Sequence, residues 1–368
     1  MRVLSIELRS FRNYEHTVCE FNPGINVITG ANAQGKTNLL EAVYMLTGGR
    51  SFRTRTDSEI IAFGADGASV SAQIEAGGRT QSVELRMQRG RRKTILQNGV
   101  RKRGSELSDC LRAVLFCPGD LGLIRDGAAS RRRLMDFAIS QLRPGYSTLL
   151  AEFSRLNEHK AYILRKRHER RDLLATLEDF NVGIVRATVE LIRYRAAFTE
   201  RLRESAAAIH RDFSGQNEEL SIEYKTLSSV TEPLGSRSQI AAEVESYLAE
   251  HQAEELQSGR CLTGAHRDDL LISIDGSLAR TFASQGQTRT AALSIKLAER
   301  EIFLRELGEH PILLLDDVLS ELDSKRREFV LERIGDGQTL ITCCEDELIR
   351  ERTGILTVTN GQIKTEGA

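Results

Sequence analysis

The sequence predicts an α/β fold in which a mixed sheet with helices, together with antiparallel strands, is interrupted by an inserted, mostly helical lobe. Two apolar stretches indicate the sheet. One, at 25–29, leads into a glycine-rich loop, and the other, at 312–315, is apolar throughout, as a parallel strand buried on both faces should be. Between them, from about 120 to 255, glycine is sparse and apolar residues recur at helical spacing.

The individual elements follow from local patterns. Leu4, Ile6 and Leu8 alternate with polar residues and predict a half-buried strand, and glycine turns separate later strands that we expect to be antiparallel. The other expected elements are strands at 24–29, 69–74, 81–87, 94–97, 270–274, 312–315 and 339–342, helices at 37–46 and 290–307, and a loop at 228–236. The expected domain parts are 1–115 and 259–368 for the sheet region and 116–258 for the helical lobe.

The bulk composition is that of an ordinary globular chain. Of 368 residues, 28% are charged and 40% hydrophobic, and the net charge is −1, so a polyanionic partner would have to meet local basic patches. The N-terminus has no apolar stretch of signal-peptide length, and no run approaches a membrane span, so we expect a cytoplasmic protein. Six scattered cysteines without a Cys-x-x-Cys spacing indicate neither a zinc site nor a disulfide framework.

The glycine-rich loop GANAQGKT matches the full G-x-x-x-x-G-K-[ST] pattern of a Walker A loop. Its glycines let the backbone N–H groups face phosphates at the positive end of the following helix. Lys36 is expected to reach the β- and γ-phosphates and to act catalytically, and Thr37 to ligate Mg²⁺. An accidental glycine turn is the alternative, which the flanking strand and helix disfavour. The predicted phosphate-binding residues are Gly30, Ala31, Asn32, Ala33, Gln34, Gly35, Lys36 and Thr37.

The stretch PILLLDDVLSELD, residues 311–323, places two carboxylates at the end of an apolar strand. Ligands of open α/β sheets bind at the C-terminal ends of the strands. Asp316 is therefore expected to hold Mg²⁺, directly or through water, and Asp317 to orient and deprotonate an attacking water. The alternative is a carboxylate pair that only caps the strand, and the Walker A loop weakens it.

The stretch FASQGQTRT, residues 282–290, precedes the expected helix at 290–307. Ser284, Gly286 and Gln287 offer a hydroxyl, exposed N–H groups and a helix dipole to an anion. The Walker A loop already serves one nucleotide, so this second anion site makes sense if it caps the γ-phosphate held by another subunit. Ser284 also suits a plain helix N-cap, and that alternative stays open.

Together the three motifs resemble those of ABC-type P-loop ATPase heads. Their order, with a long insertion between Walker A and the signature, is similar to the SMC-like branch of chromosome-maintenance and recombination proteins. Within that branch the chain resembles the RecF family, and the resemblance runs from residue 1 to about 345. The stretches that support it are LRSFRNY (8–14), SFRTRTDSEII (51–61), CPGDLGLIRDGAASRRRLMD (117–136) and TGAHRDDL (263–270).

This resemblance implies a function in DNA replication, recombination, repair of DNA damage and the SOS response. ATP and Mg²⁺ would close a homodimer on duplex DNA near single-strand gaps, and slow hydrolysis by a weak ATPase would open it. The RecO and RecR proteins are the implied partners in loading a recombinase, and no membrane is involved. The rival hypothesis is a monomeric P-loop kinase acting on a small molecule. A transporter ATPase subunit is less compatible with the charged, long insertion.

The resemblance also assigns roles to residues. Asp316 matches the Walker B aspartate, and Ser284, Gly286 and Gln287 match the signature that completes the partner's ATP site. The stretch Ser320 to Asp323 matches the D-loop, which communicates across the dimer, and Asp323 is counted among the nucleotide-binding residues. Arg12 and Asn13 resemble residues that flank the nucleotide.

Several positions depart from the family pattern. Asp317 stands where most ABC ATPases have glutamate, so we expect slow hydrolysis, and Gln285 replaces the usual second glycine of the signature. The stretch Thr342-Cys343-Cys344 lies where a switch histidine often follows the last strand. No clear Q-loop glutamine is found, although Asp120 lies near its expected place.

Basic clusters supply candidate DNA contacts, because backbone phosphates need only positive charge. The selected candidates are Arg91, Arg92, Lys93, Arg131, Arg132 and Arg133. A solvated surface is the alternative for any single run. Aromatic residues make up only 5% and tryptophan is absent, which favours duplex DNA over a stacking platform for single strands.

The stretch His266-Arg267-Asp268-Asp269 is dense in ionisable groups. It could be catalytic, form a buried Asp–Arg pair, or belong to an interdomain network of ion pairs. The sequence leaves these three alternatives open.

Overall fold

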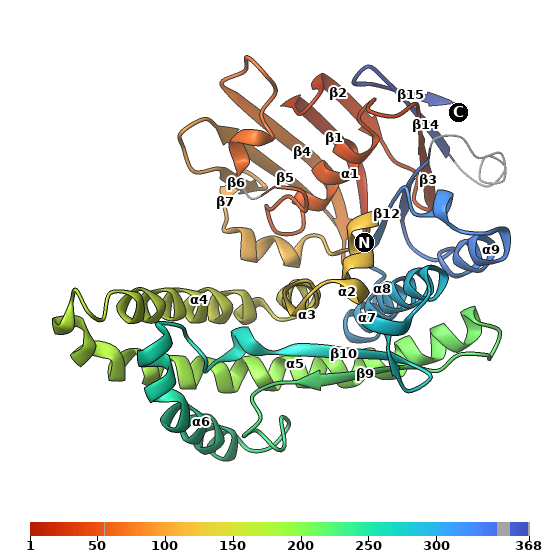
Figure 1. The fold of residues 1–368 in the computed structure, drawn as a ribbon. Helices are drawn as coiled ribbons and strands as arrows, with labels where there is room; N and C mark the ends of the chain where they lie inside the picture. The colour runs from red at the N-terminus through yellow and green to blue at the C-terminus, as the bar shows by residue number, and fades with distance from the viewer. Residues whose placement is uncertain (55, 344–353, 367–368) are drawn as a thin grey trace. The chain divides into compact units, whose positions relative to one another are not determined.

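The computed structural model describes residues 1–54, 56–343 and 354–366 (Figure 1). The chain divides into two compact units: unit 1 is Met1–Leu121 with Leu293–Ala368, and unit 2 is Gly122–Ala292. The sequence placed the second boundary earlier, after residue 258. The stretch 259–292 groups with unit 2 because its strand β10 (Asp269–Ile274) pairs with β9 (Leu220–Lys225).

Unit 1 contains two sheets in its described residues. One has the strand order β2-β1-β4-β5-β6-β7 and is antiparallel throughout, as expected for 69–97. The other has the order β15-β14-β3-β13-β12-β8, in which only the β14–β15 pair is antiparallel. The elements are β1 (Arg2–Phe11), β2 (Tyr14–Glu20), β3 (Ile25–Thr29), α1 (Lys36–Met45), β4 (Gly67–Ala76), β5 (Arg79–Gln88), β6 (Thr94–Gln97), β7 (Val100–Arg101), β8 (Ala113–Phe116), β12 (Ile312–Asp316), α9 (Ser324–Arg333), β13 (Thr339–Thr342), β14 (Gly354–Thr359) and β15 (Gln362–Glu366).

The mixed sheet joins the two ends of the sequence. Every residue of β12 and of β13 is buried, so neither strand alternates between buried and exposed positions, and β12 is apolar up to its final aspartate. β13 lies between β3 and β12 and is parallel to both. The prediction that the strand before the Walker A loop and the strand at 312–315 share one sheet is therefore confirmed, with β13 between them.

The antiparallel sheet contains one departure from the predicted pattern. The pairing of β1 with β4 shifts between Val3 and Ser5, which marks a β-bulge or local irregularity. Val3 is consequently buried together with Ile6 and Leu8, whereas Leu4 is only half-buried. The alternation assumed from Leu4 onward thus holds only beyond the bulge.

Unit 2 is mostly helical, as predicted, with three short strands in the order β11-β10-β9. Figure 1 shows α4 lying along the long helix α5. Its elements are α2 (Gly122–Arg125), α3 (Ala128–Leu142), α4 (Pro144–Arg165), α5 (Leu177–Phe213), β9, α6 (Arg237–Ser258), β10, β11 (Ser277–Leu278), α7 (Ala279–Phe282) and the start of α8 (Gln285–Leu307), which ends in unit 1.

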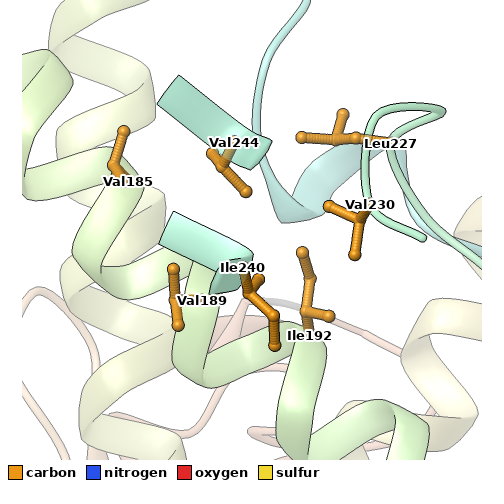
Figure 2. Packing of buried hydrophobic residues seen from close by; sticks show 7 residues of the cluster. All are labelled: Val185, Val189, Ile192, Leu227, Val230, Ile240 and Val244. Carbon is orange, nitrogen blue, oxygen red and sulfur yellow. The ribbon is translucent and has the colours of Figure 1, made fainter. Parts of the chain in front are cut away.

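The packing of α6 on α5 uses branched aliphatic side chains at helical spacing. Figure 2 shows them meeting, together with two residues from the loop between β9 and α6. All are buried, so the side chains form a satellite core inside unit 2. The members are Val185, Val189 and Ile192 of α5, Leu227 and Val230 of the loop, and Ile240 and Val244 of α6.

A buried ion-pair network holds the middle of unit 2. Arg195 of α5 is 2% exposed and donates to Asp268 Oδ2 at 2.6 Å and to Asp136 Oδ1 at 2.8 Å. Asp268 also accepts hydrogen bonds from the hydroxyls of Tyr224 and Thr226, at 2.6 and 2.7 Å. For Asp268, the alternative of a buried Asp–Arg pair is therefore the one that the structure shows. Its three partners compensate the cost of placing charge away from water.

In the described residues, no helix is both long and apolar enough to cross a membrane. Among these residues Cys19, Cys110 and Cys343 are buried, and no cluster of three or more His, Cys, Asp and Glu side chains is placed to hold a metal ion.

Replacing Arg195 with methionine should destabilise unit 2 by about 3–5 kcal/mol, because Asp268 would stay buried, and Asp136 half-buried, without their cation. Native-state hydrogen exchange of the α5 amides in rising urea measures this loss. Arg203→Met is the matched control, since Arg203 pairs with Glu200 on the exposed side of the same helix. It should cost less than about 1 kcal/mol. Equal losses in both variants would contradict the role given to the network.

Candidate nucleotide-binding site

The Walker A loop connects β3 to α1 and requires glycine at its first position. Gly30 has φ 145°, and a Cβ there would lie 2.3 Å from the carbonyl oxygen of Val358. Gly35, at φ 121°, precedes the first residue of α1 and lies against Asn13 and Tyr14. Side chains at either glycine would therefore displace backbone or strand residues rather than solvent.

Lys36 lies inside the loop that it terminates. It is 8% exposed, and its Nζ donates to the carbonyl oxygens of Gly30, at 2.5 Å, and Ala31, at 3.1 Å. The ammonium is thus held on the inner side of the loop, at the N-terminus of α1, where the helix dipole also favours an anion.

A single carboxylate oxygen at the end of β12 is bonded both to the end of the Walker A loop and to the neighbouring strand β13. Asp316 Oδ1 accepts one hydrogen bond from Thr37 Oγ1 at 2.8 Å and one from Thr342 Oγ1 at 2.9 Å. Asp316 is 6% exposed, at the C-terminal end of β12. Hydroxyl and carboxylate oxygens are ligands that Mg²⁺ accepts, so Thr37 and Asp316 fit the predicted metal site. The hydrogen bond by which Thr342 positions Asp316 was not predicted from the sequence.

Asp317 is held in a left-handed conformation at φ 52°, which aspartate tolerates better than most residues. Its backbone N–H donates to Thr342 Oγ1 at 2.8 Å, and its Oδ1 accepts a hydrogen bond from Ser320 Oγ at 2.8 Å. The predicted D-loop serine therefore contacts the predicted water-activating carboxylate. Asp323 caps α9 by accepting from the backbone N–H of Arg326 at 3.0 Å, and this bond holds the pKa of Asp323 below its usual value.

A shell of polar residues fixes the outer side of the loop. Asn13 Nδ2 donates to Gln34 O at 2.7 Å, and the backbone N–H of Asn360 donates to Gln34 Oε1 at 2.6 Å. Arg12 instead forms a two-pronged ion pair with Glu41, at 2.7 and 2.9 Å. Glu41 is fully buried on α1, and no sequence motif singled it out. Asn13 thus touches the loop directly, whereas the Arg12 guanidinium binds α1.

The Q-loop and switch positions also differ from the common pattern in what they contact. Asp120 Oδ2 accepts a hydrogen bond from the backbone N–H of Cys117 at 2.8 Å, which closes a local turn. Burial raises the pKa of the Cys117 thiol to about 12. At the switch position, Thr342 bonds Asp316 and Cys343 is buried, while Cys344 lies outside the described residues.

The predicted signature forms a reciprocal cap on α8, in unit 2. Ser284 Oγ accepts from the backbone N–H of Gln287 at 3.2 Å, and Gln287 Oε1 accepts from the backbone N–H of Ser284 at 2.9 Å. Gln287 Nε2 donates to Glu218 at 3.0 Å. The N-cap alternative is therefore correct as a local description. Ser284 and Gln285 are exposed, and Gly286 is half-buried in the first turn.

The basic candidates for DNA binding have different surroundings. Arg131 is 5% exposed, and its guanidinium binds both carboxylate oxygens of Asp269, at 2.6 and 3.0 Å. This burial removes Arg131 from the predicted DNA contacts and gives Asp269 a structural role. Arg132 donates to Asp268 O at 2.7 Å, and Lys93 pairs with Asp57 at 2.7 Å. The candidates that remain exposed are Arg91, Arg92 and Arg133.

Comparisons with known proteins agree with this geometry over nearly the whole chain. Residues 2–366 match the model of the RecF/RecN/SMC N-terminal domain. A protein of Acetivibrio thermocellus named DNA replication and repair protein RecF is 37% identical over 355 residues, which are 96% of this chain and 95% of the relative.

Two solved structures of the recombination mediator protein RecF in the RecFOR pathway superpose on the chain. The one described as RecF-ATPrS has a TM-score of 0.92 at 32% identity and covers 100% of this chain and 98% of its own. The one described as RecF-ATP has a TM-score of 0.90 at 31% identity, with coverages of 99% and 97%. The predicted fold class, an ABC-type ATPase head with an inserted helical lobe, is thereby confirmed. The chain belongs to the RecF/RecN/SMC family, and within it to the RecF proteins.

Proposed function

We propose that the chain is an ATP-dependent DNA-binding protein of replication and recombinational repair, whose nucleotide closes a homodimer on duplex DNA near single-strand gaps. The observation that supports ATP and Mg²⁺ most directly is the 2.8 Å hydrogen bond between Thr37 and Asp316, beside the buried Lys36. Relatives named for DNA replication and repair, and a neighbour described as RecF-ATP, support the same assignment.

The phosphates of the nucleotide and the metal would be bound by residues of unit 1. The backbone N–H groups of the loop and the Lys36 ammonium would bind the β- and γ-phosphates, and Thr37 and Asp316 would hold Mg²⁺. The bound metal would neutralise charge on the phosphates during transfer. Asp317 would orient the attacking water and accept its proton, with Ser320 and Thr342 fixing the position of its carboxylate and backbone.

Hydrolysis is expected to be slow because Asp317 is shorter by one methylene than the glutamate usual at this position. Its left-handed backbone and its bond to Ser320 limit how far the carboxylate can move toward the γ-phosphate. ATP then acts mainly as a switch, since the γ-phosphate supplies contacts that only the closed state makes.

The second half of the ATP site would come from another copy of the chain. Ser284 is exposed at the N-terminus of α8, a helix of 23 residues whose dipole favours an anion. The cap with Gln287 fixes the Ser284 hydroxyl at that end. In the closed homodimer this end would bind the γ-phosphate of the partner's ATP.

DNA would be held through its phosphates by exposed arginines. In unit 1, Arg91 and Arg92 are exposed after β5 and have no carboxylate partner among the described residues. Arg133 of unit 2 is exposed in the same way. The neighbour's description as a mediator in the RecFOR pathway supports RecO and RecR as the partners with which a recombinase is loaded.

Replacing Ser284 with aspartate should abolish ATP-driven dimerisation without weakening ATP binding. Aspartate keeps the helix cap but places a negative charge against the partner's γ-phosphate. Ser284→Asn is the matched control, because asparagine also caps helices and is neutral. Molar mass in solution with ATP or ADP, with and without a short duplex, measures the effect. Wild type and S284N should double in mass only with ATP.

Monomers under every condition, together with ATP turnover, would exclude the shared site and favour the small-molecule kinase instead.

Replacing Asp317 with asparagine should slow ATP hydrolysis by about 10²–10⁴-fold and prolong the dimer, because asparagine cannot accept the proton of the attacking water. Single-turnover hydrolysis and the dimer lifetime after ATP removal are the two measurements. Asp109→Asn, on an exposed turn of unit 1, should change neither. An unchanged hydrolysis rate in D317N would show that another group activates the water.

The double substitution R91A/R92A should weaken duplex binding and lower the slope of log affinity against log salt. Each lost phosphate contact removes about 0.9 from that slope. Arg79→Ala is the control, since Arg79 is exposed at the opposite end of β5, about 30 Å away. Fluorescence anisotropy with a labelled duplex, measured from about 50 to 300 mM salt, gives the slope. An unchanged slope would place the DNA elsewhere.

A further inference from the structure

Phe63 is an aromatic side chain that lies fully in solvent, with a relative exposure of 106%. It occupies a β-turn in which the backbone N–H of Ala65 donates to Ala62 O at 3.2 Å. Gly64 supplies the left-handed residue of the turn, at φ 79°. The ring therefore stands at the tip of a tight turn.

The turn is fixed at both ends, so the exposure of Phe63 is not that of a loose loop. On one side the backbone N–H of Ala62 donates to Ser10 O of β1 at 2.8 Å. On the other side the backbone N–H of Arg89 donates to Asp66 O at 3.0 Å. The Arg89 Nε also donates to Ala65 O at 3.0 Å. The backbone that carries the ring is therefore ordered in advance, and a partner would have to order only the Phe63 side chain.

The surroundings of this turn are cationic. The Arg89 side chain binds the backbone of the turn, and the exposed Arg91 and Arg92 come two and three residues after Arg89 in the sequence. Within the turn segment 62–66, Asp66 is an exposed acid. Arg91 is kept close to β5 by its own backbone N–H, which donates to Gln88 O at 3.2 Å. A partner that fits this surface offers a flat apolar face next to negative charge, which is the chemistry of a nucleic acid.

We propose that Phe63 stacks on an unpaired base at the junction between single-stranded and duplex DNA, while Arg91 and Arg92 contact phosphates of the adjoining duplex. This inference rests on the proposed DNA binding and adds a residue that selects the structure of the DNA. In continuous duplex the base faces are already stacked, and exposing one costs energy. The first unpaired base offers its face without that cost, and aromatic stacking is tolerant of base identity.

The test compares three labelled DNAs at one salt concentration with ATP present: a blunt duplex, the same duplex with a single-stranded tail, and the tailed duplex with an abasic site at the first unpaired position. Phe63→Ala should bind the tailed duplex about tenfold more weakly, equivalent to 1.4 kcal/mol, and the blunt duplex within twofold of wild type. The abasic site should cost wild type a similar factor, and should cost F63A nothing more, because ring and base act as one pair.

Control variants separate stacking from other roles of the side chain. Phe63→Tyr should retain the preference for the tail and Phe63→Leu should lose it, since leucine is apolar but has no π-face. Val18→Ala, an exposed apolar residue on β2, should bind all three DNAs as wild type does. Full retention by F63L would overturn stacking and point to an apolar protein contact. Urea midpoints equal to wild type verify that the variants are folded.

The outcomes also distinguish this inference from the proposed function. If neither wild type nor R91A/R92A binds the blunt duplex, the proposed DNA binding is wrong and the inference falls with it. If wild type binds duplex, and the ratio of the affinities for tailed and blunt DNA is the same in F63A as in wild type, DNA binding stands and junction selection by Phe63 is overturned.

Discussion

The site depends on one oxygen atom. Asp316 Oδ1 receives hydrogen bonds from Thr37 at the start of α1 and from Thr342 at the end of β13. Because β3, β13 and β12 are parallel neighbours, their C-terminal ends meet at one edge, and this oxygen sets the spacing there. Thr342 Oγ1 also accepts a hydrogen bond from the backbone N–H of Asp317. The positions of the candidate metal ligands and of the carboxylate proposed to activate water are thus linked through two threonine hydroxyls.

The interior of unit 2 combines a buried ion-pair network with apolar packing. The helices α3 and α5 and the turn before β10 meet around Arg195, whose two carboxylate partners come from different elements. A buried ion pair is a weak source of net stability, but it penalises any arrangement that leaves a charge unpaired. The apolar cluster between α5 and α6 adds burial without such selectivity (Figure 2). The network therefore penalises arrangements in which α3 and α5 are mispaired, and the cluster packs α6 against α5.

Local patterns in the sequence were sufficient for the strand–loop–helix of the Walker A motif and for β12 and β13 of the mixed sheet, because each is encoded within a few residues. The buried strand β8 of the same sheet was not predicted. Pairing over long distances was not accessible. Arg131 looked like a surface cation because its partner, Asp269, is 138 positions away. Glu41 of α1 belongs to no motif, and its role depends on Arg12 in the turn between β1 and β2. Strand β9 was not predicted although its apolar residues alternate with polar ones, because it lies within the stretch that helical spacing assigned to the lobe. Strands β14 and β15 follow the last strand that was predicted.

The contact between Gln34 and Asn360 joins residues 326 positions apart, and β3 lies between strands that come from the last part of the sequence. A chain emerging from the ribosome therefore exposes its phosphate-binding motif long before the strands that flank it exist. Until residues 339–360 have been synthesised, β3 lacks the neighbours that order the loop. A product that ends before residue 339 would therefore carry the motif without the strands that order it.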